Sequence, residues 1–154
     1  MVVWLDIRVV LALHDRQLAE HGGGTGVREA HLLESALGRP QQLYAYGDPA
    51  PDLADLAASL AFGLARNHPF VDGNKRTAAV ACESFINLND ARLKATDAEL
   101  YPRYLALAEG KLTENDFAAW LRAHIEMNPR HRVQEPPAPR SPRKPASKRT
   151  ARPQ

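Results

Sequence analysis

Residues 68–76 of this 154-residue chain read His-Pro-Phe-Val-Asp-Gly-Asn-Lys-Arg, which places a histidine, a carboxylate, a glycine, an amide and two cations within nine positions. Gly73 permits a tight turn, and an apolar pattern of helical period begins at Asn74. The first N–H groups of a helix have no acceptor within the helix and lie at the positive end of its dipole, so an anion can bind there. The sequence therefore predicts a phosphate-binding site at this turn.

Each charged side chain of this segment suits one part of phosphate chemistry. Lys75 supplies a mobile point charge, and Arg76 supplies a planar fork that matches phosphate oxygens. Asp72 would repel phosphates unless Mg²⁺ bridges the two, so a magnesium ion is expected beside it. His68 has an ordinary pKa of about 6.5, which suits a general base acting on an incoming hydroxyl near neutral pH.

The strongly periodic apolar segments of the chain all have helical spacing, and capping residues mark several helix starts. Asp6 and Asp52 are expected to cap the first and third helices, and Thr96 and Thr113 the last two. We expect helices at about residues 7–21, 28–37, 74–88, 97–109 and 114–126, and a third helix that starts after Asp52 and runs to near His68. The third should be a core helix, and it delivers His68 at its C-terminal end.

The segment after the second helix is the one place where a non-helical element is expected. Gly38-Arg39-Pro40 should stop that helix, which leaves the aromatic segment Gln42–Asp48 as a small hairpin or flap. Tyr44 and Tyr46 in this segment could align a target chain by strand addition, or could pack against the domain. The predicted fold class is all-α, a compact bundle of about six helices with a small flap between helices two and three.

Composition divides the chain at Pro129. Residues 129–154 contain eight Lys or Arg, one acid and seven of the twelve prolines, so they carry a net charge of +7, whereas residues 1–128 carry −5. We expect one folded domain over residues 1–128 and a disordered, basic, Pro-rich tail over residues 129–154. The tail could be an arm that binds nucleic acid or a solubilising extension, and both interpretations stay open.

The cysteine count and the hydropathy of the chain indicate the cellular compartment in which the protein is expected. Cys82 is the only cysteine and occupies an inward helical position, which is typical of a core residue and excludes an internal disulfide. No apolar run approaches the roughly 18 residues of a membrane span, and the N-terminus lacks the basic-then-apolar order of a signal peptide. We expect a soluble, cytoplasmic protein without a membrane partner.

The nine-residue segment resembles the core motif of the Fic/Doc family, His-x-Phe-x-(Asp/Glu)-(Gly/Ala)-Asn-(Gly/Lys)-Arg, at every position. The similarity extends upstream through His14-Asp15, residues 22–24, Gly26-Val27-Arg28, Leu32–Leu37 and Arg39-Pro40-Gln41. It covers about residues 4–126 and is closest to the death-on-curing (Doc) branch of toxin–antitoxin toxins, which implies the Fic/Doc helical fold. Three upstream charges, Arg28, Glu34 and Arg39, are expected to brace the loop or to pair with one another.

The resemblance implies a role for each motif residue and a pair of cofactors, ATP and Mg²⁺. His68 would be the general base, Phe70 would anchor the loop on the core, and Asp72 would bind Mg²⁺. The anion hole and the contacts to nucleotide phosphates would come from Gly73, Asn74, Lys75 and Arg76.

Two positions bear on which group is transferred. Most Fic enzymes that transfer AMP have Gly in place of Lys75 and a second Arg in place of Ala79, and Doc-like proteins share both departures. In the Doc branch ATP is expected to bind reversed, so that the γ-phosphoryl group reaches a hydroxyl, implied to be a threonine of elongation factor Tu, and translation stops. Gly73 favours the alternative, an AMP transferase, because AMP-transferring enzymes have Gly there whereas the founding member of the Doc branch has Ala. Since both residues are small, Lys75 is the stronger indicator and favours the kinase.

The resemblance also implies a regulatory partner. Fic proteins can be silenced by a (Ser/Thr)-x-x-x-Glu-(Gly/Asn) segment, which Thr25–Glu29 matches at five positions while Ala30 fails the sixth. Doc-like toxins are instead neutralised in trans by a small antitoxin, often resembling the prevent-host-death protein (Phd), and such a partner is expected here. The non-enzymatic alternative is a Fic-fold binding module whose basic tail contacts nucleic acid.

Overall fold

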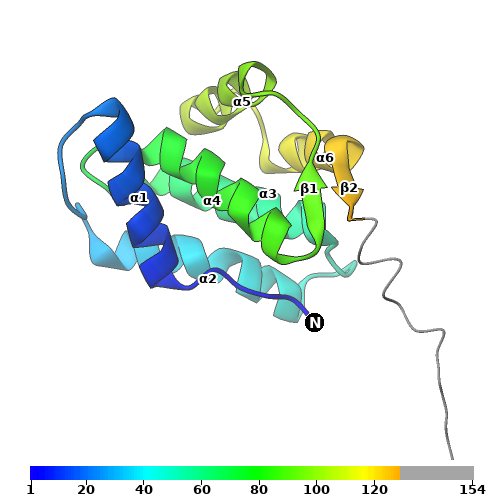
Figure 1. Cartoon of the computed structure of the whole chain (residues 1–154). Helices are drawn as coiled ribbons and strands as arrows, with labels where there is room; N and C mark the ends of the chain where they lie inside the picture. Colours follow the sequence, from blue (N-terminus) through cyan, green and yellow to red (C-terminus); the bar gives the residue numbers. More distant parts are fainter. Residues whose placement is uncertain (129–154) are drawn as a thin grey trace, which may run out of the picture.

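The computed structural model describes residues 1–128, which form six α-helices and two three-residue strands (Figure 1). The elements are α1 (Ile7–His21), α2 (Ala30–Tyr46), α3 (Leu53–Asn67), α4 (Asn74–Leu88), β1 (Ala91–Leu93), α5 (Asp97–Glu109), α6 (Glu114–His124) and β2 (Ile125–Met127). This architecture confirms the predicted all-α fold class. The tail predicted at residues 129–154 lies outside the described residues, so its disorder and its nucleic-acid contacts remain predictions.

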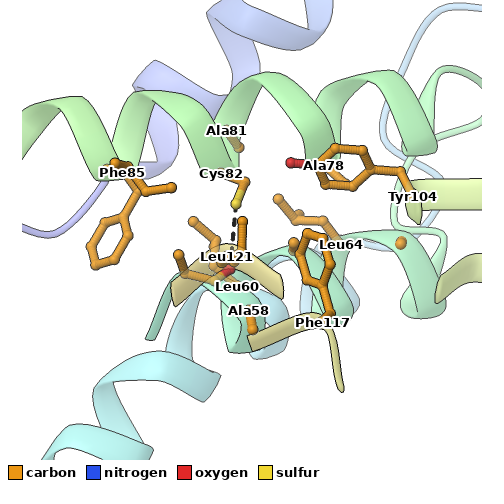
Figure 2. Close-up of a cluster of buried hydrophobic side chains, with 14 of the residues drawn as sticks. Ala58, Leu60, Leu64, Ala78, Ala81, Cys82, Phe85, Tyr104, Phe117 and Leu121 are labelled. Carbon is orange, nitrogen blue, oxygen red and sulfur yellow. Dashed lines mark hydrogen bonds between the residues drawn. The ribbon is translucent and has the colours of Figure 1, made fainter. Parts of the chain in front are cut away.

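Helix α3 forms the centre of the bundle, as its leucine and alanine pattern predicts. Ten of its fifteen residues are buried, and it contacts α2, α4, α5 and α6. Figure 2 shows Leu60 and Leu64 of α3 facing the α4 side chains, with Tyr104 and Phe117 closing the cluster from α5 and α6. Because α3 is buried against four neighbours, the loop that follows it starts from a fixed point.

Cys82 belongs to this core, as predicted. The residue is fully buried, and its thiol lies 3.7 Å from the carbonyl oxygen of Ala57 on α3. Burial raises the pKa of the Cys82 thiol to about 12, so the reactive thiolate is not accessible at neutral pH.

Helix α2 is longer than predicted, and the expected flap at Gln42–Asp48 is wrong. The helix continues through Pro40 to Tyr46, although an interior proline costs roughly 3 kcal/mol. Burial compensates, because Pro40 is enclosed in the core and α2 lies so close to α3 that a Cβ on Gly63 would be 3.1 Å from the Cα of Ala36. The helical conformation also excludes strand addition through this segment.

The aromatic residues at the end of α2 take different positions. Tyr44 packs edge-on against Trp4, with ring centroids 5.6 Å apart, which agrees with the packing alternative for that residue. Tyr46 is 81% exposed.

Local capping signals set the other helix boundaries. Asp52 with Asp55 and Thr96 with Glu99 form reciprocal capping boxes, and Asp6 caps α1 as predicted. Helix α6 ends at His124, two residues earlier than expected, because β2 pairs antiparallel with β1. None of the helices between residues 1 and 128 is both long and apolar enough to cross a membrane.

Candidate active site

The nine-residue motif spans the loop between α3 and α4 and the first turn of α4, and Arg28 binds the start of this loop. His68 ends α3 with a left-handed backbone, at φ 50°. Arg28 donates hydrogen bonds from Nε to the His68 carbonyl oxygen (2.8 Å) and from Nη2 to that of Asn67 (3.0 Å). The expectation that Arg28 braces the loop is therefore confirmed. Arg39 instead bonds Glu114 and Ser59, remote from the motif.

A buried histidine of α1 supports the middle of the loop. The His14 ring stacks on the ring of Phe70, with centroids 3.8 Å apart, and its Nε2 donates to the Asp72 carbonyl oxygen at 2.8 Å. Phe70 is 1% exposed, so its predicted role as an anchor is confirmed. The sequence alone gave His14 no function, although its place on the apolar face of α1, four residues after Val10, was a signal of burial.

The glycine-rich segment before α2 lies against the outer side of the loop. Val27 pairs with Phe70 in an antiparallel bridge, and the Val71 N–H donates to the Gly26 carbonyl oxygen at 3.1 Å. The Gly24 N–H donates to Asp72 Oδ2 at 2.9 Å, so the segment also orients the carboxylate. Gly23 has φ +124° and a side chain there would lie 3.2 Å from the Asp72 Cβ, which explains why glycine occupies this position.

The Asn74 side chain holds the loop in shape. Its Oδ1 accepts from the Phe70 N–H and its Nδ2 donates to the Phe70 carbonyl oxygen, both at 3.0 Å. Because the amide is buried and bonded on both sides, a contact between Asn74 and an anion would come from its backbone N–H. Among residues 1–128 no side chain caps the N-terminus of α4, so the first N–H groups of the helix remain open to a ligand.

The structure brings five of the predicted site residues around one pocket of about 370 Å³. It is lined by Asp72, Gly73, Asn74, Lys75 and Arg76, together with Tyr101 and residues at the end of α1. The Arg76 guanidinium lies over the Tyr101 ring, with its carbon 4.9 Å from the ring centre. His68 does not line this pocket and stands at the opposite end of the loop.

Cations surround His68 and affect its protonation. Burial, followed by the charges of Lys75, Arg28 and Arg66, lowers the pKa of His68 below its ordinary value. The ring is therefore neutral at physiological pH, with a lone pair on one nitrogen. A neutral imidazole is the form that can accept a proton from a hydroxyl.

The pocket fits a magnesium ion that is bound mainly through phosphate oxygens. Asp72 is exposed, and among the described residues Gly24 is the only donor bonded to its carboxylate, which leaves Oδ1 for a metal. No group of three or more His, Cys, Asp or Glu that could enclose a metal occurs within residues 1–128. One carboxylate in a cationic pocket is the arrangement that would suit Mg²⁺ bound together with a nucleotide.

Comparison with known proteins identifies the family. Residues 4–86, more than half of the chain, match the model of the Fic/DOC family. The chain is 47% identical to Toxin Doc of Mycolicibacterium smegmatis over 74 residues, 48% of this chain and 57% of that relative, so the match spans little more than half of the relative's length. It is 31% identical to Protein kinase doc of Escherichia phage P1 over 113 residues, 73% of this chain and 88% of the relative. The chain therefore belongs to the Fic/DOC family.

Proposed function

We propose that this protein is a Doc-like toxin that transfers the γ-phosphoryl group of Mg-ATP to a hydroxyl of a target protein. The observation that carries the proposal is the pocket at the open N-terminus of α4, where Asp72, Lys75 and Arg76 meet. Such a pocket combines helix dipole, cations and one carboxylate, which suits a magnesium-bound polyphosphate. The phage relative, named as a protein kinase, adds support for phosphoryl transfer.

The role proposed for His68 follows from the family motif, because His68 does not line the pocket. The roles of Asp72, Lys75 and Arg76 agree with their positions around it. His68 removes the proton from the target hydroxyl, whose oxygen attacks the γ-phosphorus while the bond to the β–γ bridging oxygen breaks and ADP leaves. Lys75, Arg76 and the first N–H groups of α4 hold the phosphates and offset their charge. Asp72 would hold Mg²⁺, which supplies further charge neutralisation at the phosphate oxygens.

The alternative, transfer of AMP, rests on Gly73, and the backbone offers another reason for that glycine. Gly73 has φ +79°, a left-handed conformation that favours glycine. A Cβ there would lie in ordinary contact, 3.5 Å from Leu18 Cδ2 and 3.6 Å from His14 Cδ2, so the glycine is not required to make space. Because the loop geometry accounts for Gly73, Lys75 is the better indicator, and it favours the kinase.

The proposed target is a threonine of elongation factor Tu, whose phosphorylation would stop translation. The proposed regulator is a small Phd-like antitoxin that binds in trans. A short reading frame beside this one, whose product restores growth when both are expressed, would support the toxin assignment.

The decisive experiment supplies ATP labelled at either the α- or the γ-phosphate to the full-length protein with elongation factor Tu. We expect γ-label on the target and a rate reduced about 10²–10⁴-fold in His68→Ala. His31→Ala is the matched control, because His31 is a 73% exposed histidine outside the motif, and this variant should keep full activity. Label arriving only from the α-position would establish the AMP transferase instead. A protein that binds no nucleotide, but binds nucleic acid until truncated at Pro129, would favour the non-enzymatic module.

A further inference from the structure

A second cavity of about 340 Å³ lies along α4, directly beside the phosphate pocket. The two cavities share four lining residues, Gln17, His21, Arg76 and Tyr101. The stacked pair of Arg76 and Tyr101 therefore stands in the wall common to both. A ligand whose phosphates occupy the first cavity can extend into the second without leaving the protein surface.

The two cavities carry opposite charge. In the phosphate pocket Lys75, Arg76 and the helix N-terminus outweigh the one carboxylate, Asp72. In the second cavity three carboxylates outweigh the shared Arg76: Glu20, Glu83 and Asp97. Glu83 is half-buried, and its pKa is raised by this burial and then by the charge of Asp97. Carboxylates repel phosphate oxygens but accept hydrogen bonds from hydroxyl groups. The charges thus direct phosphates to one cavity and hydrogen-bond donors to the other.

The spacing along α4 suits one continuous ligand. Arg76 and Glu83 lie seven residues apart on the same helix face, a separation of about 10.5 Å at 1.5 Å per residue. This distance is comparable with that between the terminal phosphate and the sugar of an extended nucleotide. Between them, Ala79 and Val80 line the cavity from α4, and Leu100 lines it from α5. An apolar wall with a few placed acceptors is typical of a small-molecule site.

We propose that the second cavity binds the nucleoside end of ATP, with Glu83 and Asp97 accepting hydrogen bonds from the ribose hydroxyls. The inference rests on the proposed nucleotide substrate. A carboxylate that accepts from a ribose hydroxyl is the same chemistry that dinucleotide-binding enzymes use. The arrangement sets the direction of the nucleotide, with the ribose toward α5 and the terminal phosphate at the N-terminus of α4, on the side of the motif loop.

Equilibrium binding tests this inference without requiring catalysis. Calorimetry on the full-length protein would compare ATP, 2′-deoxy-ATP, 3′-deoxy-ATP and inorganic tripolyphosphate. For the wild type we expect ATP to bind about tenfold more tightly than at least one deoxy analogue, because a hydrogen bond to a charged acceptor is lost. In Glu83→Gln or Asp97→Asn, ATP should weaken to the level of that analogue while tripolyphosphate does not weaken. Glu109→Gln removes an exposed charge of α5 that pairs with Lys111, and this control should behave as wild type.

The sign of the Glu83→Gln effect decides the direction of the nucleotide. Tighter ATP binding in this variant would overturn the inference, because it would mean that phosphates lie beside Glu83. Equal affinity for ATP and both deoxy analogues in the wild type would also overturn it, as expected if the carboxylates instead receive a basic side chain of a protein partner. If the protein binds ATP more tightly than a deoxy analogue but transfers no γ-phosphoryl group, this inference stands and the proposed kinase activity is refuted. If it transfers the γ-phosphoryl group but binds ATP and both deoxy analogues equally, the kinase stands and this inference is refuted.

Discussion

The N-termini of α3 and α4 are built in opposite ways, although both helices have fifteen residues and pack against each other in the core (Figure 1). Helix α3 begins with the capping box of Asp52 and Asp55, and Arg122 of α6 binds both carboxylates. Helix α4 begins with a glycine and has Lys75 in its first turn. The N-terminus of α3 is capped by the protein's own carboxylates, whereas no carboxylate from the described part of the chain caps the N-terminus of α4.

The difference suggests that the N-terminus of α3 serves stability, whereas the N-terminus of α4 is available to bind a ligand. A carboxylate at a helix N-terminus satisfies orphan N–H groups and complements the dipole, so it stabilises the fold. Leaving that position open forgoes this stabilisation but retains the N–H groups for an external anion. Cations in the first turn oppose the dipole and are unfavourable for the isolated helix, which makes sense if a polyphosphate neutralises them.

The largest expected effect comes from giving α4 an acid like that of α3. Gly73→Asp places a carboxylate at the anion site in a left-handed conformation that Asp and Asn tolerate. We expect ATP affinity to fall about a hundredfold, because like charges within a few ångströms repel by several kcal/mol in a partly solvated site. Gly73→Asn has the same shape without the charge, and its affinity should fall only a few-fold. Calorimetry of both variants measures the comparison, and equal affinities would show that no anion binds at this helix end.

The next effect concerns how an uncapped helix start keeps its shape. His14 of α1, which is distant in sequence, holds the loop before α4 in place by stacking on Phe70 and donating a hydrogen bond to the Asp72 carbonyl oxygen. His14→Phe retains the stacking but leaves a carbonyl without its donor, which should lower the free energy of unfolding by about 1–3 kcal/mol. We expect phosphoryl transfer to slow about tenfold, with the kcat changed more than the KM for ATP. A change in stability alone, with an unaltered kcat, would mean that His14 is a core residue without a positioning role.

A smaller effect is expected from opening the N-terminus of α3. Asp52→Ala removes the cap and should cost about 1–2 kcal/mol in denaturant unfolding, while transfer activity is unchanged. Asp52→Asn keeps the capping acceptor and should cost less, since it loses only the charge opposite Arg122. A loss of ATP affinity in either variant would contradict the distinction between the two helix ends.

The pH dependence of this cap has a defined sign. Arg122 lowers the pKa of Asp52 below its ordinary value of 3.8, so the folded state binds the proton less readily than the unfolded chain. The contribution to stability is therefore complete above about pH 4 and is lost as the pH falls further. Unfolding of the wild type and Asp52→Asn should differ at neutral pH and converge in strong acid.

Local signals made much of the fold predictable. The starts of α1, α3 and α5 follow from the capping residues Asp6, Asp52 and Thr96, which lie directly before each helix. Pro40 misled the prediction for α2, because its effect depends on burial against residues distant in sequence. The strands β1 and β2 are three residues each and pair across more than thirty residues, so neither has a periodic pattern of its own.

In the candidate site, too, the features encoded by neighbouring residues were predictable and most of those that depend on long-range contacts were not. The motif identified the residues of the loop, because they are adjacent in sequence and fixed in type. The bracing by Arg28 was predicted, but the partner of His14 was not, since His14 lies 58 residues from Asp72 and a histidine on an apolar helix face gives no indication of its partner. The same holds for the amide of Asn74, whose bonds to Phe70 require the loop to be folded.

The smallest expected effect is the influence of the Lys75 charge on the pKa of His68, which lies at the end of α3. Burial and then the charge of Lys75 lower the pKa of His68, and the base acts in its neutral form. The rate of transfer should therefore stay level near neutral pH and fall only as the pH drops below about 6.5. In Lys75→Met the lost charge should move this acidic limb to higher pH by less than about one unit, in addition to any loss of overall rate. Lys111→Met, at an exposed lysine outside the pocket, provides the control. A limb that stays in place in Lys75→Met would mean that burial and the charges of Arg28 and Arg66 set the protonation of His68, and that Lys75 acts on the phosphates without tuning the base.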